Sequence, residues 1–339
     1  MTKEMQRIVI AFCLMQSVLS FGQQMPQFSQ YQRNQYMVNP GAAGMYDFVD
    51  ITLGGRMQWA GFDNAPMSSY LYASSVISRK PRVRYNPALR TSVGPVRNPE
   101  INTGKLKHAI GGMLIADQYG AFRQMKGAVT YALHIPLSDK MNMSFGANLG
   151  LSNRAFLKDR AQTLNVLNPS LGYTDNTYDT YAQSSNLNTM DIGAGLYVYS
   201  KKLFLGIAAE QLTRDFVSFG GTNMVYVDPR MHLNFSAGYK FSLSDNLSLM
   251  PSVLLKYMQP APLSLEGTLQ LEYKEWLWFA LSFRQGVGGF NNSDAFIAMA
   301  GLNISETFKL GYSYDYSISQ FNQHSAGGHE IVLGLMLGR

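Results

Sequence analysis

The sequence predicts an all-β protein, a transmembrane antiparallel up-and-down β-barrel of about 14 strands. The first observation is an alternation: Thr307–Ser317 reads TFKLGYSYDYS, with apolar and aromatic residues on one parity and polar residues or glycine on the other. Successive side chains of a strand point to opposite faces, so this segment has one aromatic and one polar face. The second observation is that this alternation recurs along nearly the whole chain. The third is that the connections between the segments alternate in length.

The composition also fits many short strands. The chain has 339 residues, of which 46% are hydrophobic and only 15% charged, with 20 Tyr, 19 Phe and 31 Gly. Mean hydropathy is −0.10. Beyond the N-terminal region, no stretch approaches the roughly 18 consecutive apolar residues of a membrane helix. These features favour strands over helices.

The N-terminus has the pattern of an export signal. A positively charged start precedes the apolar stretch Ile8–Leu19, and Ser20 and Gly22 place small residues at the −3 and −1 positions. We therefore expect cleavage before Gln23. The predicted divisions are a signal peptide over residues 1–22, an N-terminal periplasmic or lumenal segment over residues 23–44, and an outer-membrane barrel over residues 45–339.

Residues 23–44 are polar, rich in Gln and Asn, and carry Phe28, Tyr31 and Tyr36. Tyrosine and glutamine combine apolar area with hydrogen bonding, which suits a plug in a polar lumen or a strap at its mouth. The segment has no alternation long enough to cross a membrane. We predict an ordered segment at or inside the periplasmic mouth, with a disordered leader as the alternative.

Fourteen alternating segments follow, an even number as single-chain bacterial barrels require. A tilted strand of about 9–11 residues crosses the hydrocarbon layer once. In chain order, the predicted strands are Val49–Trp59, Met67–Ile77, His108–Asp117, Arg123–Ile135, Met141–Ser152, Asp191–Tyr199, Leu203–Leu212, Met231–Phe241, Leu247–Tyr257, Leu263–Tyr273, Trp276–Arg284, Ala295–Asn303, Thr307–Ser317 and His329–Leu337.

Short and long connections alternate between these strands. The short turns are Pro136–Lys140, Ser200–Lys202, Ser242–Asn246, Lys274–Glu275 and Ser305–Glu306. The longer links are Asn153–Met190, Thr213–Arg230, Met258–Pro262, Gly286–Asp294 and Ile318–Gly328. Outer-membrane barrels have short periplasmic turns and long external loops, so the rhythm predicts that both termini are periplasmic.

One link, Ser78–Lys107, breaks this rhythm because it is long yet falls on the periplasmic side. Its prolines argue against a helix or a ladder strand. It carries a single acid, Glu100, against eight basic residues: Arg79, Lys80, Arg82, Arg84, Arg90, Arg97, Lys105 and Lys107. Clustered like charge steers association, so the link is either a solvated flexible loop or a docking patch for an acidic periplasmic partner.

Charged residues on the polar parity of the strands are expected to face the lumen. A charge facing lipid at the midplane costs about 2–4 kcal/mol for Lys or Arg. The candidates are Lys126, Glu210, Lys240, Lys256, Glu266, Glu272, Arg284, Lys309 and Asp315. Their signs are mixed, whereas an ion-selective pore usually shows one dominant sign. Mixed charge fits internal ion pairs or a lumen closed by a plug.

Seven aromatic residues near strand ends are predicted to form girdles at the headgroup boundary. They are Trp59, Tyr70, Tyr72, Trp276, Trp278, Tyr312 and Tyr316. Trp276 and Trp278 share the parity of Arg284, which leaves a lumenal position open for these two.

No motif in the chain specifies an enzyme. The only cysteine, Cys13, falls in the predicted signal peptide, so the mature chain would have neither a disulfide nor a thiol nucleophile. None of the five histidines accompanies a Ser-centred motif, and the spacing of His324 and His329 fits no metal template. We expect no catalytic residue, no cofactor, no metal and no nucleic-acid partner.

The two ends of the chain carry paired motifs. At the N-terminal end, residues 23–44 (QQMPQFSQYQRNQYMVNPGAAG) are followed by Arg56, Gln58-Trp59, Gly61-Phe62-Asp63 and Ala65-Pro66. Near the C-terminus, LGYSYDYSIS (Leu310–Ser319) precedes GGHEI (Gly327–Ile331). In these motifs, and over essentially its whole mature length, the chain resembles the PorP/SprF family of type IX secretion system membrane proteins.

This resemblance implies an integral outer-membrane barrel of a Gram-negative bacterium, accessory to type IX protein secretion and gliding motility. Such proteins support export or surface attachment of cargo such as adhesins, and they work with the translocon and periplasmic ring components. Two features depart from the expected pattern: the length of the Ser78–Lys107 link and a last strand that ends LMLGR without an aromatic residue. The main alternative is a passive porin or solute channel, and a lipid hydrolase active at the barrel rim is a third.

Overall fold

The computed structural model describes residues 27–62, 64–77, 101, 103–161, 168, 176, 178–179, 186–213, 218–219, 230–258, 261, 263–274, 276–286, 293–305, 307–318 and 325–338. The predicted signal peptide and its cleavage site lie outside these residues. Among the described residues, no helix is long and apolar enough to cross a membrane.

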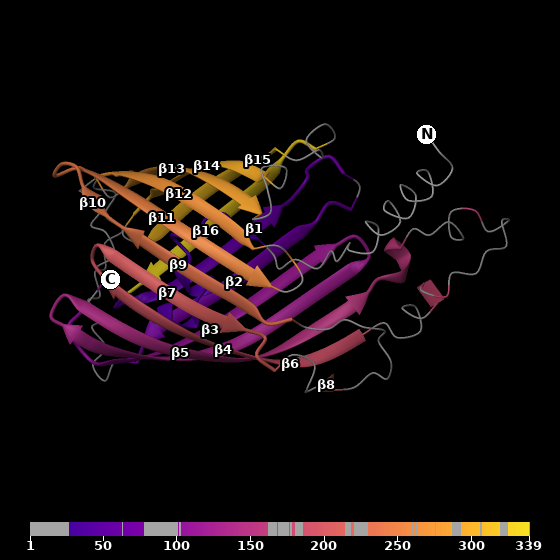
Figure 1. Ribbon diagram of the computed structural model, residues 1–339, viewed down its shortest axis with the longest axis horizontal. Helices are drawn as coiled ribbons and strands as arrows, with labels where there is room; N and C mark the ends of the chain where they lie inside the picture. The colour runs from indigo at the N-terminus through magenta and orange to yellow at the C-terminus, as the bar shows by residue number, and fades with distance from the viewer. Residues whose placement is uncertain are drawn as a thin grey trace, which may run out of the picture.

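The described chain forms one closed antiparallel β-barrel (Figure 1). Its strands are β1 Val49–Met57, β2 Met67–Val76, β3 Lys107–Tyr119, β4 Phe122–Ser138, β5 Met141–Phe156, β6 Asn186–Ser200, β7 Leu203–Glu210, β8 Ser218–Phe219, β9 His232–Tyr239, β10 Phe241–Ser242, β11 Leu247–Met258, β12 Ser264–Tyr273, β13 Leu277–Gly286, β14 Ser293–Asn303, β15 Phe308–Ser317 and β16 Gly328–Leu337. Three short 3-10 helices accompany them: η1 Gln35–Met37, η2 Pro40–Ala42 and η3 Lys158–Arg160.

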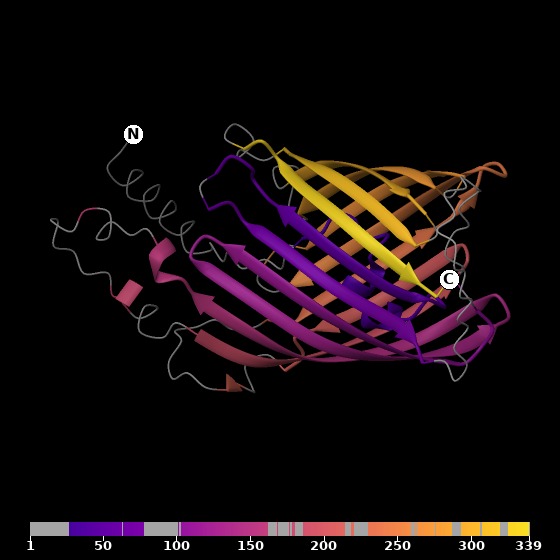
Figure 2. The same ribbon diagram turned by 180° about the vertical axis from the view of Figure 1, so that it is seen from behind.

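Fourteen strands complete the circuit. Of the sixteen labelled strands, β8 and β10 are two-residue pieces, β8 pairing with β6 and β10 continuing β9 after Lys240. Each remaining strand pairs with its neighbour in sequence, and β1 pairs with β16 from Val49↔Leu337 to Met57↔His329 to close the barrel (Figure 2). The prediction of fourteen antiparallel strands is therefore confirmed.

Burial alternates along the strands as the sequence pattern predicts. Strand β12, for example, has exposed and buried residues in strict succession from Glu266 onward, with Leu269 56% exposed on the outer face. The outer wall also exposes Leu281 and Val129, at 70% and 66%. A band of exposed leucine and valine around a barrel is typical of the surface that a membrane protein turns toward lipid.

Strands β4, β5 and β6 run further than their alternation predicts, with 17, 16 and 15 residues. Pairing continues from Lys126↔Ser152 to Phe122↔Phe156, past the point where apolar outward residues give way to Arg123 and Asn153. Backbone hydrogen bonding does not require an apolar face, so the ladder continues where the hydropathy pattern stops. Figure 1 shows these strands projecting at one end of the barrel.

The two ends of the barrel differ. One, here called the short-turn end, carries the tight turns at residues 139–140, 201–202 and 243–246, together with the C-terminus. The other, the long-loop end, carries the longer connections. Two connections depart from this rule: β3 and β4 join through a tight turn at Gly120 at the long-loop end, and the long link between β2 and β3 lies at the short-turn end. Which side of the membrane the two termini face is not fixed by the fold, so their periplasmic position stays a prediction.

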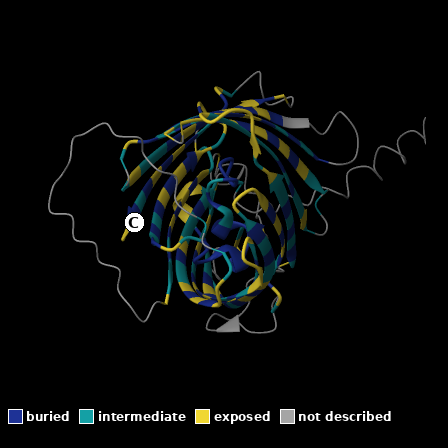
Figure 3. Cartoon of the chain, turned by 90° about the vertical axis from the view of Figure 1, so that its left-hand side faces the viewer, coloured by how far each residue is buried: buried dark blue, intermediate teal, exposed yellow. Residues whose placement is uncertain are grey.

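Residues 27–46, here called the plug, lie inside the barrel, and none of them is exposed. Figure 3 shows buried chain inside the ring of strands when the barrel is viewed from the short-turn end. Ser29 hydrogen-bonds to the start of β16 near the long-loop end, whereas Tyr46 bridges to Ile101 at the short-turn end. The plug therefore runs along the lumen instead of stopping at one mouth.

Three aromatic residues predicted for the girdle are lumenal instead. Tyr70 is 2% exposed, Tyr72 1% and Trp278 4%, and Tyr70 packs edge-on against Phe28 of the plug with ring centroids 4.5 Å apart. The girdle prediction was wrong for Tyr70 and Tyr72, which lie on the inward parity of β2; Trp278 takes the lumenal position that its parity left open. The other four, Trp59, Trp276, Tyr312 and Tyr316, are 40–49% exposed.

Candidate functional site: a lumenal plug held by a buried charge network

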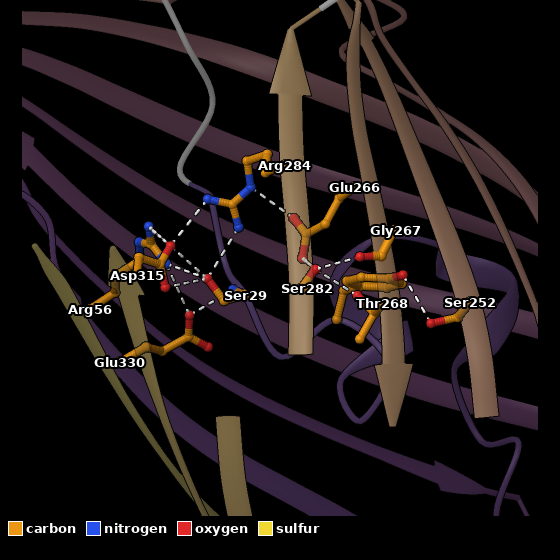
Figure 4. A network of polar contacts seen from close by, with 11 residues as sticks. Ser29, Arg56, Ser252, Glu266, Gly267, Thr268, Ser282, Arg284, Asp315 and Glu330 are labelled. Atoms are coloured by element: carbon orange, nitrogen blue, oxygen red, sulfur yellow. Dashed lines mark hydrogen bonds and ion pairs between the residues drawn. The ribbon is translucent and has the colours of Figure 1, made fainter. Parts of the chain in front are cut away.

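Ser29 lies at the centre of a buried charge network near the long-loop end (Figure 4). Its backbone N–H donates to Glu330 Oε2 at 2.7 Å, and its hydroxyl donates to Asp315 Oδ1 at 3.0 Å. The same hydroxyl accepts from Arg56 Nη1 at 2.5 Å and from Arg284 Nη2 at 3.1 Å. One serine of the plug thereby joins strands β1, β13, β15 and β16.

The charges around Ser29 also pair with one another. Arg56 Nη2 lies 2.7 Å from Asp315 Oδ2 and Arg56 Nη1 lies 3.5 Å from Glu330 Oε2. Arg284 bridges Asp315 at 3.2 Å and Glu266 at 2.8 Å. All five side chains are at most 5% exposed. Buried charges need such pairing, and removing one partner of a buried pair typically destabilises a protein by about 3–5 kcal/mol.

A glycine-lined seat receives the middle of the plug. Asn39, Pro40 and Gly41 lie against glycines of β5, β6 and β7, and a Cβ on Gly195 would overlap the Asn39 side chain. A Cβ on Gly146 would overlap the main chain of Pro40 and Gly41. Glycine at these wall positions therefore allows the plug backbone to approach the sheet closely.

Asn39 fixes the turn that occupies this seat. Its side chain accepts a hydrogen bond from the Gly41 N–H at 2.8 Å, which caps η2. The Nδ2 group of the same side chain donates to the backbone carbonyls of Leu196 and Ile207, at 3.0 and 3.2 Å. One residue therefore shapes the turn and attaches it to β6 and β7.

Tyrosines connect the plug to further strands. Tyr36 donates to Thr130 Oγ1 at 2.7 Å, and Tyr31 shares a hydrogen bond with Ser252 at 3.0 Å. Asn34 donates to Tyr70 at 2.8 Å and accepts from Tyr72 at 3.2 Å. Burial raises the pKa of Tyr36 to about 12, with a smaller contribution of the same sign from the charge of Glu210. The phenol is therefore held neutral as a hydrogen-bond donor.

The plug leaves the lumen through contacts at the short-turn end. His134 Nε2 lies 2.8 Å from the Ala43 carbonyl, and its Nδ1 lies 2.8 Å from the Tyr199 hydroxyl. A carbonyl only accepts, so Nε2 carries the proton and Tyr199 donates to Nδ1. Burial raises the pKa of Tyr46, the last plug residue, to about 12.

The nine predicted lumen-facing residues all lie on the inner wall, eight of them in ion pairs. Arg284, Glu266 and Asp315 belong to the network of Ser29. The other pairs are Lys126 with Asp191 at 2.6 Å and Glu210 at 2.9 Å, Lys240 with Glu272 at 2.9 Å, and Lys309 with Asp50 at 2.9 Å. Lys256 is partly buried on β11 beside Asn234 of β9.

Of the eight basic residues proposed for partner contact, six lie outside the described residues: Arg79, Lys80, Arg82, Arg84, Arg90 and Arg97. Lys105 is exposed at the short-turn end. Lys107 is buried and donates to the Met45 carbonyl at 3.2 Å and to Asp47 at 3.4 Å. Lys107 therefore holds the end of the plug.

The last part of the same link folds over the short-turn mouth. Ile101 packs against the buried cluster that includes Met45 and Tyr199. Thr103 donates to the Asp139 carbonyl at 2.9 Å, and the Gly104 N–H donates to Asn142 at 2.8 Å. Ile101, Thr103 and Gly104 therefore form an ordered base at this mouth.

Sequence reasoning missed four residues that hold the plug: Ser29, Asn39, Arg56 and Glu330. Two of them could have been found, because Arg56 follows Asp50, Thr52 and Gly54 on the inward parity of β1 and Glu330 occupies the inward parity of β16. Ser29 and Asn39 carry no local signal, since their partners belong to distant strands.

Solved structures with a similar fold include channels for monoaromatic hydrocarbons. A TodX deletion mutant, a monoaromatic hydrocarbon channel, has a TM-score of 0.50 and 8% identity, covering 90% of this chain and 94% of its own. The CymD monoaromatic hydrocarbon channel has a TM-score of 0.49 and 12% identity, with 89% and 91% covered. The toluene transporter TodX of P. putida has a TM-score of 0.48 and 8% identity, with 90% and 94% covered. At these identities the likeness concerns the fold alone.

Comparison with functionally curated proteins gives no match. The family model described as type IX secretion system membrane protein PorP/SprF matches residues 20–335, nearly the whole chain. The matched range includes the plug and all barrel strands except the last two residues of β16. The chain belongs to the PorP/SprF family of type IX secretion system membrane proteins.

Proposed function

We propose that this protein is a non-enzymatic scaffold of the type IX secretion system, embedded in the outer membrane, that supports export or surface attachment of cargo such as adhesins. Family membership supports the place in the secretion system, and the barrel with its apolar outer wall supports the place in the outer membrane. The observation that carries the scaffold role is the occupied lumen.

The occupied lumen favours a scaffold over a passive porin or solute channel. The plug bonds to strands all around the barrel: Tyr36 to β4, Tyr31 to β11 and Ser29 to β15. An open pore needs a continuous path for water, and charges of both signs in a porin lumen would remain hydrated. Here eight of the nine predicted lumenal charges form ion pairs, and the five charged side chains around Ser29 are at most 5% exposed.

Planar bilayer recording separates these two roles. A scaffold with a fixed plug gives no steady conductance after reconstitution, whereas a porin gives a large and steady current. The variant Gly195→Ala, which crowds the plug seat, serves as the opened reference. A steady wild-type current equal to that of Gly195→Ala would contradict the scaffold role.

The short-turn end is the proposed contact face for translocon or periplasmic ring components. Short turns face the periplasm in outer-membrane barrels. Ile101, Thr103 and Gly104 form an ordered base at this end, and they follow the basic stretch of residues 78–100 in the sequence. Clustered positive charge attracts an acidic partner and raises its association rate. The long connection between β5 and β6 at the opposite end is the proposed contact for exported cargo.

A pull-down from solubilised envelopes tests this face. The test variant replaces the six basic residues of the link by Gln and keeps residues 101–107, which close the mouth: Arg79, Lys80, Arg82, Arg84, Arg90 and Arg97. The matched control replaces exposed lysines of the short turns, Lys140, Lys201 and Lys202, by Gln. We expect loss of periplasmic partners with the test variant alone. Unchanged recovery of partners would contradict the docking role of the link.

A further inference from the structure

We propose that the lumen wall is a binding site for an extended polypeptide, and that the plug is its resident occupant, exchangeable for a segment of a second chain. The identification of that second chain as a component or cargo of secretion rests on the proposed function. The binding site itself rests on the contacts described below.

At four positions the wall binds backbone groups of the plug, which every polypeptide has. Asn234 donates to the Val38 carbonyl at 3.2 Å, His134 to the Ala43 carbonyl and Lys107 to the Met45 carbonyl. Glu330 accepts from the Ser29 N–H. Four strands, β3, β4, β9 and β16, thus supply side chains to the backbone of the occupant. Recognition of backbone groups tolerates changes of sequence, as in strand addition to a sheet edge.

Glycines of the same wall let the plug lie close to the sheet at further positions. Besides the seat for Asn39, a Cβ on Gly111 would lie 2.6 Å from the Tyr36 hydroxyl, and a Cβ on Gly311 would overlap the Gln30 side chain. These glycines belong to β3 and β15, on different sides of the lumen from the seat. Together with the seat, which receives the main chain of Pro40 and Gly41, they form a track along which the plug lies close to the sheet.

The plug itself fits this track incompletely. Among the described residues, Gln30 Nε2 and Gln32 Nε2 are buried without a hydrogen-bond partner. A buried donor without a partner has lost its hydrogen bonds to water and destabilises the bound state. The backbone of the plug is well matched while two of its side chains are not, so an occupant with other side chains at these positions would bind more strongly.

The wall also offers hydrogen-bonding groups that the plug does not use. Ser313 Oγ is buried without a partner in the described structure, although it lies between Gly311 and Asp315, the β15 positions that contact Gln30 and Ser29. Gln270 Oε1 on β12 is unpartnered in the same way. These unused groups give a second chain contacts that would offset the loss of the plug.

The covalent connection of the plug to β1 sets the condition for exchange. A tethered segment acts at an effective concentration of the order of mM, so a free competitor must be abundant or be held nearby by docking elsewhere on the barrel. A partner bound at either end of the barrel meets this condition. The ligand class is therefore an extended polypeptide segment presented by a docked protein.

A single-cysteine assay on the purified full-length mature protein tests the exchange. The only cysteine, Cys13, lies in the predicted signal peptide, so Ala43→Cys places one thiol at a plug position with no exposed surface. The probe is a synthetic peptide with the sequence of residues 27–46, and the readout is the rate of maleimide labelling. A mirror-image peptide of the same sequence is the matched control for the ligand.

We expect the natural peptide, and not its mirror image, to raise the labelling rate of Ala43→Cys severalfold by trapping the state in which the plug has left its seat. Ala132→Cys, equally buried but in strand β4, should stay unlabelled. The proposal is overturned if the natural peptide leaves the rate unchanged, if both peptides raise it equally, or if Ala132→Cys becomes reactive as well. This assay contains no secretion partner. Its failure would therefore contradict peptide exchange alone, whereas failure of the pull-down would contradict the proposed docking face.

Discussion

Ser29 and Asp315 are separated by 286 positions in the chain, and their side chains share a hydrogen bond of 3.0 Å inside the barrel. Asp315 also pairs with Arg56 of the first strand, which lies beside the last strand at the closure of the barrel. Seating of the plug and closure of the barrel therefore depend on the same charges. We expect the two events to be coupled in folding.

Arg56→Met should destabilise the barrel by about 3–5 kcal/mol, because Asp315 and Glu330 would each lose a buried cationic partner. Urea unfolding in detergent micelles, followed by heat-dependent migration on a gel, measures the change. Lys201→Met, at an exposed turn, is the control and should be neutral within about 0.5 kcal/mol. Equal stability of the two variants would show that the network contributes little.

Gly195→Ala should loosen the plug, because the added Cβ overlaps the Asn39 side chain. Overpacking of this kind costs typically about 1–3 kcal/mol. Limited proteolysis of the purified protein should then remove residues 27–40, which the wild-type barrel protects. Gly267→Ala is the matched control, since a Cβ there has no neighbouring atom within 4 Å and faces outward. Equal protection of both variants would contradict the seat.

Alkaline pH should release the plug between pH 10 and about 12. The pKa of Tyr36 and of Tyr46 is raised by burial from 10.0 to about 12, so both phenols stay neutral in the folded state over a range where an unfolded chain ionises. Their contribution to stability is complete below pH 10 and is lost as the pH rises through the folded value. Labelling of Ala43→Cys against pH measures the release.

Tyr36→Phe combined with Tyr46→Phe is the control for this titration. Phenylalanine has no ionisable hydroxyl. The labelling rate of the double variant should therefore change less between pH 10 and 12. A profile that is identical with and without the tyrosines would assign the alkaline transition to other groups.

Leu281→Arg should hinder insertion into lipid. Leu281 is 70% exposed in the middle of β13 on the outer wall, and an arginine facing lipid at the midplane costs about 2–4 kcal/mol. The folded fraction after refolding into lipid vesicles measures the effect. Leu281→Ala, which adds no charge, should insert like the wild type. Normal insertion of the arginine variant would place this wall outside the hydrocarbon layer.

The lumenal charges show how far sequence reasoning reaches. Parity alone placed Arg284, Lys126 and Asp315 on the polar face of their strands, and these side chains lie inside the barrel. The alternation did not predict which acidic residue would pair with each basic residue. Arg284 pairs with Glu266 on the neighbouring strand, a register contact, but it also pairs with Asp315 two strands away, which only the curvature of the barrel brings near.

The aromatic residues show the converse. Strand-end position suggested a girdle for Tyr70, Tyr72 and Trp278, yet all three are buried inside. Their own parity indicated the inside, and the plug explains why large aromatic rings fit there. Phe28 packs on Tyr70, and Arg33 lies over the ring of Trp278 at 5.4 Å from its centroid. The surroundings of these rings therefore depend on the plug in the lumen, which the sequence of a single strand does not indicate.

The amino-acid sequence by itself determined the wall of this protein: fourteen strands, their order and their inner and outer faces. This is so because a two-residue period is a local property of each strand, and because short turns force neighbours in sequence to pair. Only the tertiary structure decided the path of the plug, its glycine-lined seat and the partners of Ser29. Those contacts join residues hundreds of positions apart, and they exist only once the sheet has closed into a barrel of a given circumference.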